Sequence, residues 1–375
     1  MRAGFLLLAA VTIVAAKVPN QPHPSIGIFS SPLVDCPEPP SDLEDIHSCV
    51  FGTYVRWLEA AGVRVVPMRW DDPLDRKIDL MRNLNGVLFA GGSLDVQPQY
   101  YQRFRDRVCE IVNVSKSWNA EGDRFVLWGT CQGFQMLSAC IGGSLDVVHD
   151  GFKGVAPKML ALNFTRKTQG SRMYGFADDR TLSDLQHSPT TLNYHHEGVL
   201  PEDFEAGRPL GDFFDVTSTN SDAVGRQFVS TMEAKNAAIY GVQYHPEWPP
   251  FDWSDSRIAK SDGAVRVSKF VSQFLRTQLE SNNHTFPTPD HLEAVVIARH
   301  PVSYQGYGKE RFWVGGVPKA TRNTHAALIA IAVFAAAASF VAGAAAGRAI
   351  VTRSIRRSPR VGSEKTDGTS LYHEP

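Results

Sequence analysis

The sequence predicts an α/β fold in which a mostly parallel central sheet is flanked by helices. Short apolar runs at Ile26–Phe29, Val63–Val66 and Gly86–Phe89 have the length of buried strands. Apolar residues with helical spacing occupy the stretches between these runs, Phe51–Ala61 and Leu74–Leu84. Strands that alternate with helices form parallel sheets with helices on both faces, and such sheets bind ligands at the carboxyl ends of their strands.

A further apolar run, Phe125–Trp128, leads directly into Gly129-Thr130-Cys131-Gln132-Gly133 and a helix-like pattern from Phe134. This order predicts a tight strand-to-helix turn that lifts Cys131 out of the sheet. A thiol at a helix N-terminus is favoured as thiolate, and the N–H of Gln132 points to where an oxyanion would form. The motif by itself leaves open that Cys131 is only a small buried side chain.

The run Ile239–Gln243 predicts another strand, which ends at Tyr244-His245-Pro246-Glu247. A cysteine nucleophile requires a base that is close in space, and the base requires an orienting group. His245 is the candidate base, and Glu247 is the candidate group that holds its imidazole. The two motifs together favour a catalytic Cys131.

Between and after these motifs the pattern is less regular. The region 142–236 contains short β-like pieces at Phe213–Val216 and Gln227–Ser230, and 261–280 predicts a closing amphipathic helix.

The motifs around Cys131 and His245 resemble those of the gamma-glutamyl hydrolases (folylpolyglutamate hydrolases), within the class I glutamine amidotransferase-like superfamily. The resemblance extends from about Ile26 to about Phe286. Further matching segments are Tyr54–Gly62, Leu88–Asp95, Leu162–Thr165, Ser171–Met173, Asn193–His195 and Ser218–Asp222.

The resemblance implies a cysteine hydrolase that cleaves γ-glutamyl bonds, with poly-γ-glutamyl folates as substrate and no metal or cofactor. In this family Cys131 would attack the γ-carbonyl, His245 would act as base and then as acid, and Glu247 would orient His245. The resemblance also implies that the region 142–236 covers and shapes the substrate pocket.

The resemblance assigns two further roles. The N–H of Gly92 becomes a second oxyanion donor opposite that of Gln132, and His195 becomes a substrate-binding residue. From the residues alone, Gly91-Gly92 is a tight turn and His195 is a structural loop histidine. His196 has no matching position and is expected to face solvent.

The N-terminus predicts entry into the secretory pathway. Arg2 precedes an apolar run, and small residues before Lys17 suit cleavage of a signal peptide, 1–16. Sequons begin at Asn113, Asn163 and Asn283. The near-equal numbers of basic (38) and acidic (39) residues give no reason to expect a nucleic-acid partner.

The sequence contains five cysteines, so setting Cys131 aside leaves Cys36, Cys49, Cys109 and Cys140. An oxidising compartment permits two disulfides among them, in any of three connectivities. Cys36–Cys49 would close a local loop, but four buried thiols are an equal alternative.

The C-terminal part predicts a membrane anchor. After a catalytic domain, 22–290, and a stalk, 291–325, the segment 326–347 is apolar and free of charge. Arginines follow at once in the tail, 348–375, which the positive-inside rule places in the cytosol. These features predict a single-pass type I protein with its catalytic domain in the lumen of a lysosome or vacuole or at the cell surface. A buried Ala-rich helix is the alternative.

Two other functions compete with this interpretation. The first is a glutaminase-type amidotransferase subunit, although the sequence has no second catalytic domain or nucleotide-binding Gly-Lys-[Ser/Thr] loop. The second is a non-catalytic membrane receptor that retains the fold. The sequence leaves the oligomeric state open, including a homodimer.

Overall fold

The computed structural model describes residues 23–252, 254–304 and 310–319. Its central eight-stranded sheet has the order β5-β1-β6-β7-β13-β12-β11-β9. The five strands from β5 to β13 are parallel, and the last three pair antiparallel. The strands are β1 (Ser25–Phe29), β5 (Arg64–Met68), β6 (Gly86–Phe89), β7 (Val126–Thr130), β9 (Asn163–Phe164), β11 (Phe214–Ser221), β12 (Gln227–Ala234) and β13 (Ile239–Val242). The predicted α/β fold with a mostly parallel sheet is confirmed.

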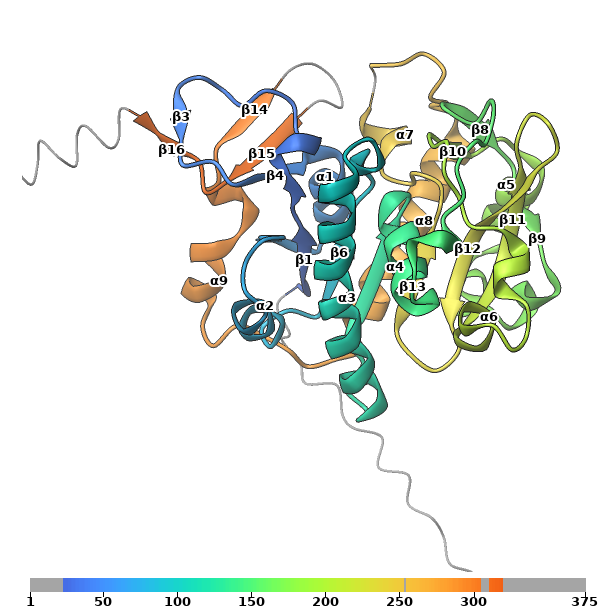
Figure 1. The fold of residues 1–375 in the computed structure, drawn as a ribbon, viewed down its shortest axis with the longest axis horizontal. Helices are drawn as coiled ribbons and strands as arrows, with labels where there is room; N and C mark the ends of the chain where they lie inside the picture. The colour runs from blue at the N-terminus through green and yellow to red at the C-terminus, as the bar shows by residue number, and fades with distance from the viewer. Residues whose placement is uncertain (1–22, 253, 305–309, 320–375) are drawn as a thin grey trace, which may run out of the picture. The chain divides into compact units, whose positions relative to one another are not determined.

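Helices cover both faces of this sheet (Figure 1). On one face α1 (Gly52–Ala60) and α8 (Asp262–Leu279) pack on the strands, with Trp57 against Trp128 and Phe274 against Tyr240. On the other face lie α2 (Leu74–Met81), α3 (Pro98–Ala120) and α4 (Gln132–Gly142). The hydroxyl of Ser261 accepts the N–H of Ala264 and so caps the first turn of α8.

The helix α3 was not predicted from the sequence. Its 23 residues include a buried stripe with spacings of three and four, which is the period of one helix face. Charged residues lie between the stripe positions, so this helix contains no continuous apolar run that would indicate it in the sequence. The stripe consists of Tyr101, Phe104, Val108, Ile111, Val112 and Ser115.

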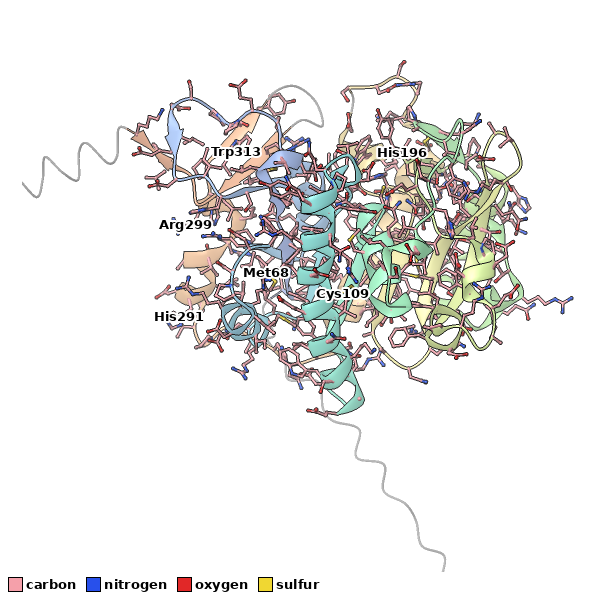
Figure 2. The ribbon with its side chains drawn as sticks, in the orientation of Figure 1. Met68, Cys109, His196, His291, Arg299 and Trp313 are labelled. Carbon is pink, nitrogen blue, oxygen red and sulfur yellow. A yellow bond between two sulfur atoms is a disulfide. The ribbon has the colours of Figure 1, made fainter. Side chains whose placement is uncertain are left out.

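Two disulfides are present, Cys36–Cys49 and Cys109–Cys140, and Cys131 is the free cysteine of the described residues. The first is the predicted local loop. The second joins α3 to α4, the helix that follows Cys131 (Cys109 is labelled in Figure 2). An odd cysteine outside the pairing is what a thiol nucleophile requires.

The region 142–236 is more regular than its sequence pattern suggests. Its strands β11 and β12 have eight residues each and extend the central sheet. Their polar residues are buried in pairs, since Ser218 Oγ lies 2.8 Å from Thr231 Oγ1 and Ser230 Oγ lies 2.7 Å from Asn220 Oδ1. Hydrogen-bonded polar side chains can thus occupy positions that an apolar pattern would assign to solvent.

The same region adds smaller elements. They are β8 (Lys158–Leu160), β10 (Thr191–Asn193), α5 (Asp179–His187) and α6 (Pro209–Phe213). A short helix, α7 (Trp248–Phe251), follows the His245 motif. The 3₁₀ helices are η1 (Leu33–Asp35), η2 (Leu94–Val96), η3 (Leu145–Val147), η4 (Arg166–Gly170), η5 (Tyr174–Phe176), η6 (Pro201–Phe204) and η7 (Ile297–Arg299).

The first part of the predicted stalk, 291–325, is folded. The helix α9 (Pro289–Val295) is followed by β14 (Val302–Tyr304), β15 (Glu310–Val314) and β16 (Val317–Pro318). The strand β15 pairs with β4 (Ser48–Phe51), which also pairs with β2 (Ser31–Pro32), and β16 pairs with β3 (Leu43–Glu44).

The reason that the segment folds is its few large apolar side chains. Ile297, Trp313 and Val314 are buried, and burial of each such group favours folding by about 1.5–3 kcal/mol. Figure 2 labels Trp313 on β15 and Arg299 and His291 on the preceding segment. A stalk starting at His291 therefore differs from the structure, in which the compact unit extends to Val317.

Three predicted segments, the signal peptide 1–16, the membrane helix 326–347 and the tail 348–375, lie outside the described residues. Within 23–252, 254–304 and 310–319, no helix has the length and apolar character needed to cross a bilayer.

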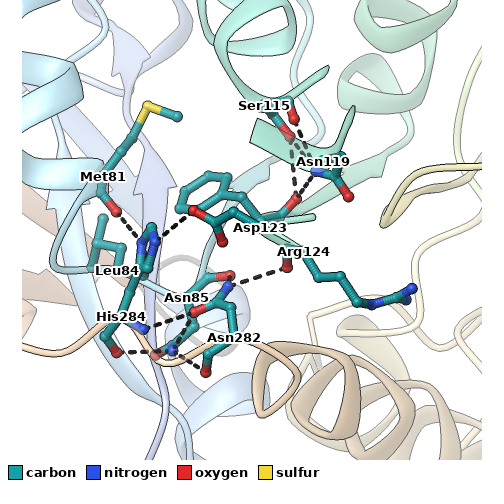
Figure 3. Close-up of polar contacts among 10 residues, drawn as sticks. Met81, Leu84, Asn85, Ser115, Asn119, Asp123, Arg124, Asn282 and His284 are labelled. Atoms are coloured by element: carbon teal, nitrogen blue, oxygen red, sulfur yellow. Dashed lines mark hydrogen bonds and ion pairs between the residues drawn. The ribbon is translucent and has the colours of Figure 1, made fainter. Parts of the chain in front are cut away.

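A polar network closes the amino-terminal edge of the sheet (Figure 3). The side chains of Asn85 and Asn282 lie 2.9 Å apart, Nδ2 to Oδ1, and Asn282 also donates to the carbonyl of Asn85. His284 Nε2 lies 2.8 Å from Asp123 Oδ2. Because Asn85 directly precedes β6, this network lies at the edge where the parallel strands begin. The carboxyl ends of these strands lie at the opposite edge.

Candidate active site

Cys131 occupies the predicted turn between β7 and α4. Its backbone has φ 51° and ψ −111°, a conformation that a residue with a side chain rarely adopts, and its N–H donates to Val242 O at 2.9 Å. The turn also requires a glycine at 133, because a β-carbon there would lie 2.0 Å from Phe89 O. Packing on both sides thus holds a strained backbone that presents the thiol at the N-terminus of α4.

The strand β13 lies beside β7, and His245 follows its end. The N–H of His245 donates to Leu192 O at 2.7 Å, which fixes this segment next to β10. Its ring hydrogen-bonds to the side chain of Cys131, and Nδ1 lies 2.7 Å from Glu247 Oε1. His245 is 5% exposed and Glu247 0%. The structure therefore brings together the three residues that the sequence motifs nominate for catalysis.

Burial on its own would lower the pKa of His245. The negative charges of Glu247 and of a Cys131 thiolate outweigh burial, and the pKa of the His245 imidazole is raised above its usual value. The imidazole can therefore hold the thiol proton while Glu247 neutralises the resulting positive charge. This is the charge arrangement of a cysteine nucleophile with its base.

Three amides of the loop after β6 have identified acceptors. The N–H of Gly91 donates to the Tyr54 hydroxyl at 2.7 Å, that of Ser93 to Asp35 Oδ1 at 2.9 Å, and that of Leu94 to Gln132 Oε1 at 2.8 Å.

In the part of the chain that the structure describes, the N–H of Gly92 has no protein acceptor, and neither does the N–H of Gln132 at the start of α4. The Gln132 side chain lies close to the backbone of Gly92, since a β-carbon on Gly92 would lie 2.9 Å from Gln132 Nε2. Two unpaired N–H groups beside a nucleophile form a suitable oxyanion site.

Tyr54 is a site residue that sequence reasoning missed. Its position on the apolar face of the helix at 51–61 indicated only a core residue. Its hydroxyl accepts the Gly91 N–H, and its pKa is raised well above the usual value, first by burial and then by the charge of Glu247. The neutral hydroxyl therefore holds the loop at Gly91 and lies near the carboxylate of Glu247.

His195 lies next to the site but is enclosed by protein. Its Nδ1 lies 2.7 Å from Glu197 O and its Nε2 3.3 Å from Asn193 Oδ1. The edges of its ring pack against Phe152 and Phe228. Burial lowers its pKa to about 3, so the ring is neutral. Because a neutral imidazole carries one N–H, the ring can donate to only one of these two oxygens. A substrate that accepts from this N–H would have to replace that oxygen.

The neighbouring residues line the space in front of the thiol. The carbonyl oxygen of Tyr194 lies 3.9 Å from Cys131 Sγ. The Tyr194 ring packs against Trp248, whose ring centroid is 4.8 Å from that of His245. Because Tyr194 is 44% exposed, these aromatic rings lie where solvent meets the site.

His196 was expected to face solvent, and its side chain is 54% exposed (it is labelled in Figure 2). It nevertheless makes specific contacts, since Nε2 lies 3.0 Å from Asp95 Oδ2 and Nδ1 lies 2.9 Å from Asp150 Oδ1. The hydrogen bond with Asp150 is the main cause of a raised His196 pKa. His196 therefore joins the loop after β6 to the segment around Asp150.

Comparisons with known proteins agree with this geometry. The sequence matches the family described as Peptidase C26 over residues 24–247. The gamma-glutamyl hydrolase of Homo sapiens is 35% identical over 261 residues, which cover 68% of this chain and 79% of that protein. The Bos taurus enzyme is 34% identical over 304 residues, covering 80% and 92%. Gamma-glutamyl hydrolase 1 of Arabidopsis thaliana is 26% identical over 285 residues, covering 76% and 80%. The chain therefore belongs to the peptidase C26 family of gamma-glutamyl hydrolases and is a cysteine peptidase of that family.

Proposed function

We propose that the chain hydrolyses γ-glutamyl bonds of poly-γ-glutamyl folates through a thioester on Cys131. The main support is the combination of Cys131, His245 and Glu247 with the unpaired N–H groups of Gly92 and Gln132. The substrate class is taken from the relatives, which are named gamma-glutamyl hydrolases. The site by itself supports acyl transfer.

In the first half of the reaction, the thiolate of Cys131 attacks the γ-carbonyl carbon and the carbonyl oxygen becomes an oxyanion. The N–H groups of Gly92 and Gln132 donate to this oxyanion. His245 then gives the thiol proton to the nitrogen of the leaving group. The C–N bond breaks, and a γ-glutamyl thioester remains on Cys131.

In the second half, His245 takes a proton from water, which attacks the thioester carbon. The C–S bond breaks, the product leaves as the γ-carboxylic acid, which loses its proton to solvent, and the thiolate forms again beside protonated His245. Glu247 keeps the imidazole in one orientation throughout, because its carboxylate accepts from Nδ1–H at 2.7 Å. These steps are written with water and with the side chains and backbone N–H groups of this chain.

The substrate class is tested with paired substrates. A γ-linked diglutamate conjugate of folate should be cleaved, whereas the α-linked isomer should be cleaved at most ~10⁻⁴ as fast, because unpaired polar groups in the site disfavour the wrong isomer. Cys131→Ala should abolish cleavage while leaving the folded state and substrate binding intact. Equal cleavage of both isomers would contradict the γ-glutamyl assignment.

We further propose that the catalytic unit is lumenal or extracellular. Two disulfides support an oxidising compartment, as does the exposure of all three sequon asparagines, Asn113, Asn163 and Asn283. The segment 326–347 is the proposed single membrane anchor. Protease added outside sealed vesicles should shorten the chain only by the tail beyond Arg348. Removal of N-glycans should lower the mass of the protected fragment, and digestion of the catalytic unit would reverse the orientation.

A further inference from the structure

Asp35 makes a contact with the proposed oxyanion site that no catalytic motif includes. Asp35 ends η1, far from the motifs in sequence, yet its Oδ1 accepts both the N–H of Ser93 at 2.9 Å and the hydroxyl of Ser93 at 3.0 Å. Its Oδ2 is buried and has no hydrogen-bond partner. A β-carbon on Gly92 would lie 2.5 Å from that oxygen, so the carboxylate lies directly against the backbone of Gly92.

The loop that bears Asp35 is held from two directions. The next residue, Cys36, forms a disulfide with Cys49 on β4, and β2 just before η1 pairs with the same strand. Arg311 on β15 adds an attractive charge for the Asp35 carboxylate. The position of Asp35 is therefore determined by the disulfide and by the pairing of β2 with β4.

We propose that Asp35 is a positioning residue, whose carboxylate holds the loop Gly91–Leu94 so that the N–H of Gly92 faces the substrate carbonyl oxygen. The inference rests on the proposed function, since it concerns the oxyanion of that reaction. Tyr54 and Gln132 hold the N–H groups of Gly91 and Leu94, but Asp35 holds the amide that directly follows Gly92. Without this contact the chain after Gly92 is no longer anchored, so the peptide between Gly91 and Gly92, which carries the Gly92 N–H, can turn and this N–H loses its direction.

The structure separates this role from the roles of Cys131 and His245. In the described part of the chain no hydrogen bond or ion pair joins Asp35 to either residue, so loss of its carboxylate should leave the thiolate and its base in place. Alkylation of the thiolate by iodoacetamide forms no oxyanion, whereas hydrolysis forms one in each half of the reaction. Damage to the oxyanion site should therefore slow hydrolysis by Cys131 but leave the rate of its alkylation unchanged.

The test uses the full-length protein and a γ-linked diglutamate conjugate. Asp35→Ala should lower kcat by about 10- to 100-fold, approaching the loss of an oxyanion donor, with KM and the rate of Cys131 alkylation each within about 2-fold of wild type. Asp35→Asn keeps an oxygen acceptor for Ser93, so its kcat should stay within about 3-fold of wild type. Asp42→Ala, an exposed carboxylate in the same disulfide loop, is the matched control and should leave kcat unchanged.

The inference is wrong if Asp35→Ala keeps kcat within 2-fold, if Asp35→Asn falls as far as Asp35→Ala, or if alkylation slows in parallel with hydrolysis. If thermal unfolding shows that Asp35→Ala is not folded, Asp35→Glu is used in its place. Its longer side chain keeps the charge but presses on Gly92, so it should lower kcat. A wild-type protein that alkylates at Cys131 but cleaves no γ-linked conjugate would refute the proposed function, and this inference with it.

Discussion

Gly91 lies against the imidazole of His245: a β-carbon on it would lie 2.7 Å from Cε1 of His245. The same β-carbon would lie 3.3 Å from Cβ of Cys131. The position opposite the thiol and its base thus has room only for a hydrogen atom. The glycine pair after β6 is therefore required by the space between nucleophile and base as well as by the turn.

Gly91→Ala should lower kcat by about 10²-fold or more, because the methyl group displaces the His245 ring and small misplacements of reacting groups have effects of this size. Steady-state kinetics checks the loss. Gly170→Ala is the control, since a β-carbon at Gly170 meets no atom within 4 Å and should leave kcat unchanged. Normal activity of the Gly91 variant would place the His245 ring elsewhere during catalysis.

Glu247→Gln should lower kcat by about 10²- to 10⁴-fold, with the larger value typical of the matching change in serine enzymes. The amide cannot neutralise an imidazolium, so the raised pKa of His245 should fall. The pH dependence of Cys131 alkylation measures this fall in the pKa of His245. In the variant, His245 should lose its proton at a lower pH than in wild type, so the thiolate loses its positively charged partner at that lower pH. Glu202→Gln, at an exposed carboxylate, should change neither quantity. An unchanged alkylation profile would mean that Glu247 is not the orienting group.

His195→Ala should lower hydrolysis of γ-linked substrates by at least about 10-fold while the alkylation rate of Cys131 stays within about 2-fold. In the described conformation the ring supports the segment 193–197, whose Tyr194 carbonyl oxygen faces Cys131 Sγ. His195→Gln can replace one of the hydrogen bonds and should recover part of the loss. If both variants hydrolyse at the wild-type rate, His195 contributes neither to binding nor to support.

The contacts of His196 predict a stability that depends on pH. Its pKa is raised in the folded state, so its contribution is fully present below the unfolded-state pKa of 6.5 and is lost as pH rises through the raised value. Both aspartates are outside the core and the ring is half-exposed, so the effect should be about 0.5–1 kcal/mol.

Chemical denaturation of wild type and His196→Gln at pH 5 and pH 9 measures this effect. The difference in unfolding free energy should be present at pH 5 and absent at pH 9. A difference that is larger at pH 9 would contradict the assigned direction.

The two disulfides should contribute unequally to stability. Cys109–Cys140 closes a separation of 31 residues and Cys36–Cys49 one of 13. Loop-closure entropy predicts losses of about 3.7 and 2.9 kcal/mol when each pair is replaced by alanine. Thermal unfolding with and without a reducing agent checks both losses, and the reducing agent should have no further effect on a variant that lacks both pairs.

Local sequence motifs made much of the site predictable. Each motif consists of neighbouring residues and can therefore be recognised in the sequence. These motifs are the apolar run before Cys131, the glycines around it and the His-Pro-Glu sequence after β13, the strand beside β7. Since parallel strands present their carboxyl ends at one edge, Cys131 and His245 were expected to meet there, and the structure brings them into contact. The alternation of strands and helices in the first ninety residues likewise predicted β1, α1, β5, α2 and β6.

Only the tertiary structure decided the contacts between distant segments. Four features depend on which surfaces meet in the folded chain. They are the partner of each cysteine, the hydrogen bond from the Ser93 N–H to Asp35, the enclosure of His195 and the pairing of β15 with β4. Local periodicity identifies the buried face of an element but not the element that covers it. Trp313 illustrates this: it lies in a short apolar run, Phe312–Val314, but the strand that it pairs with, β4, lies more than two hundred residues earlier in the chain.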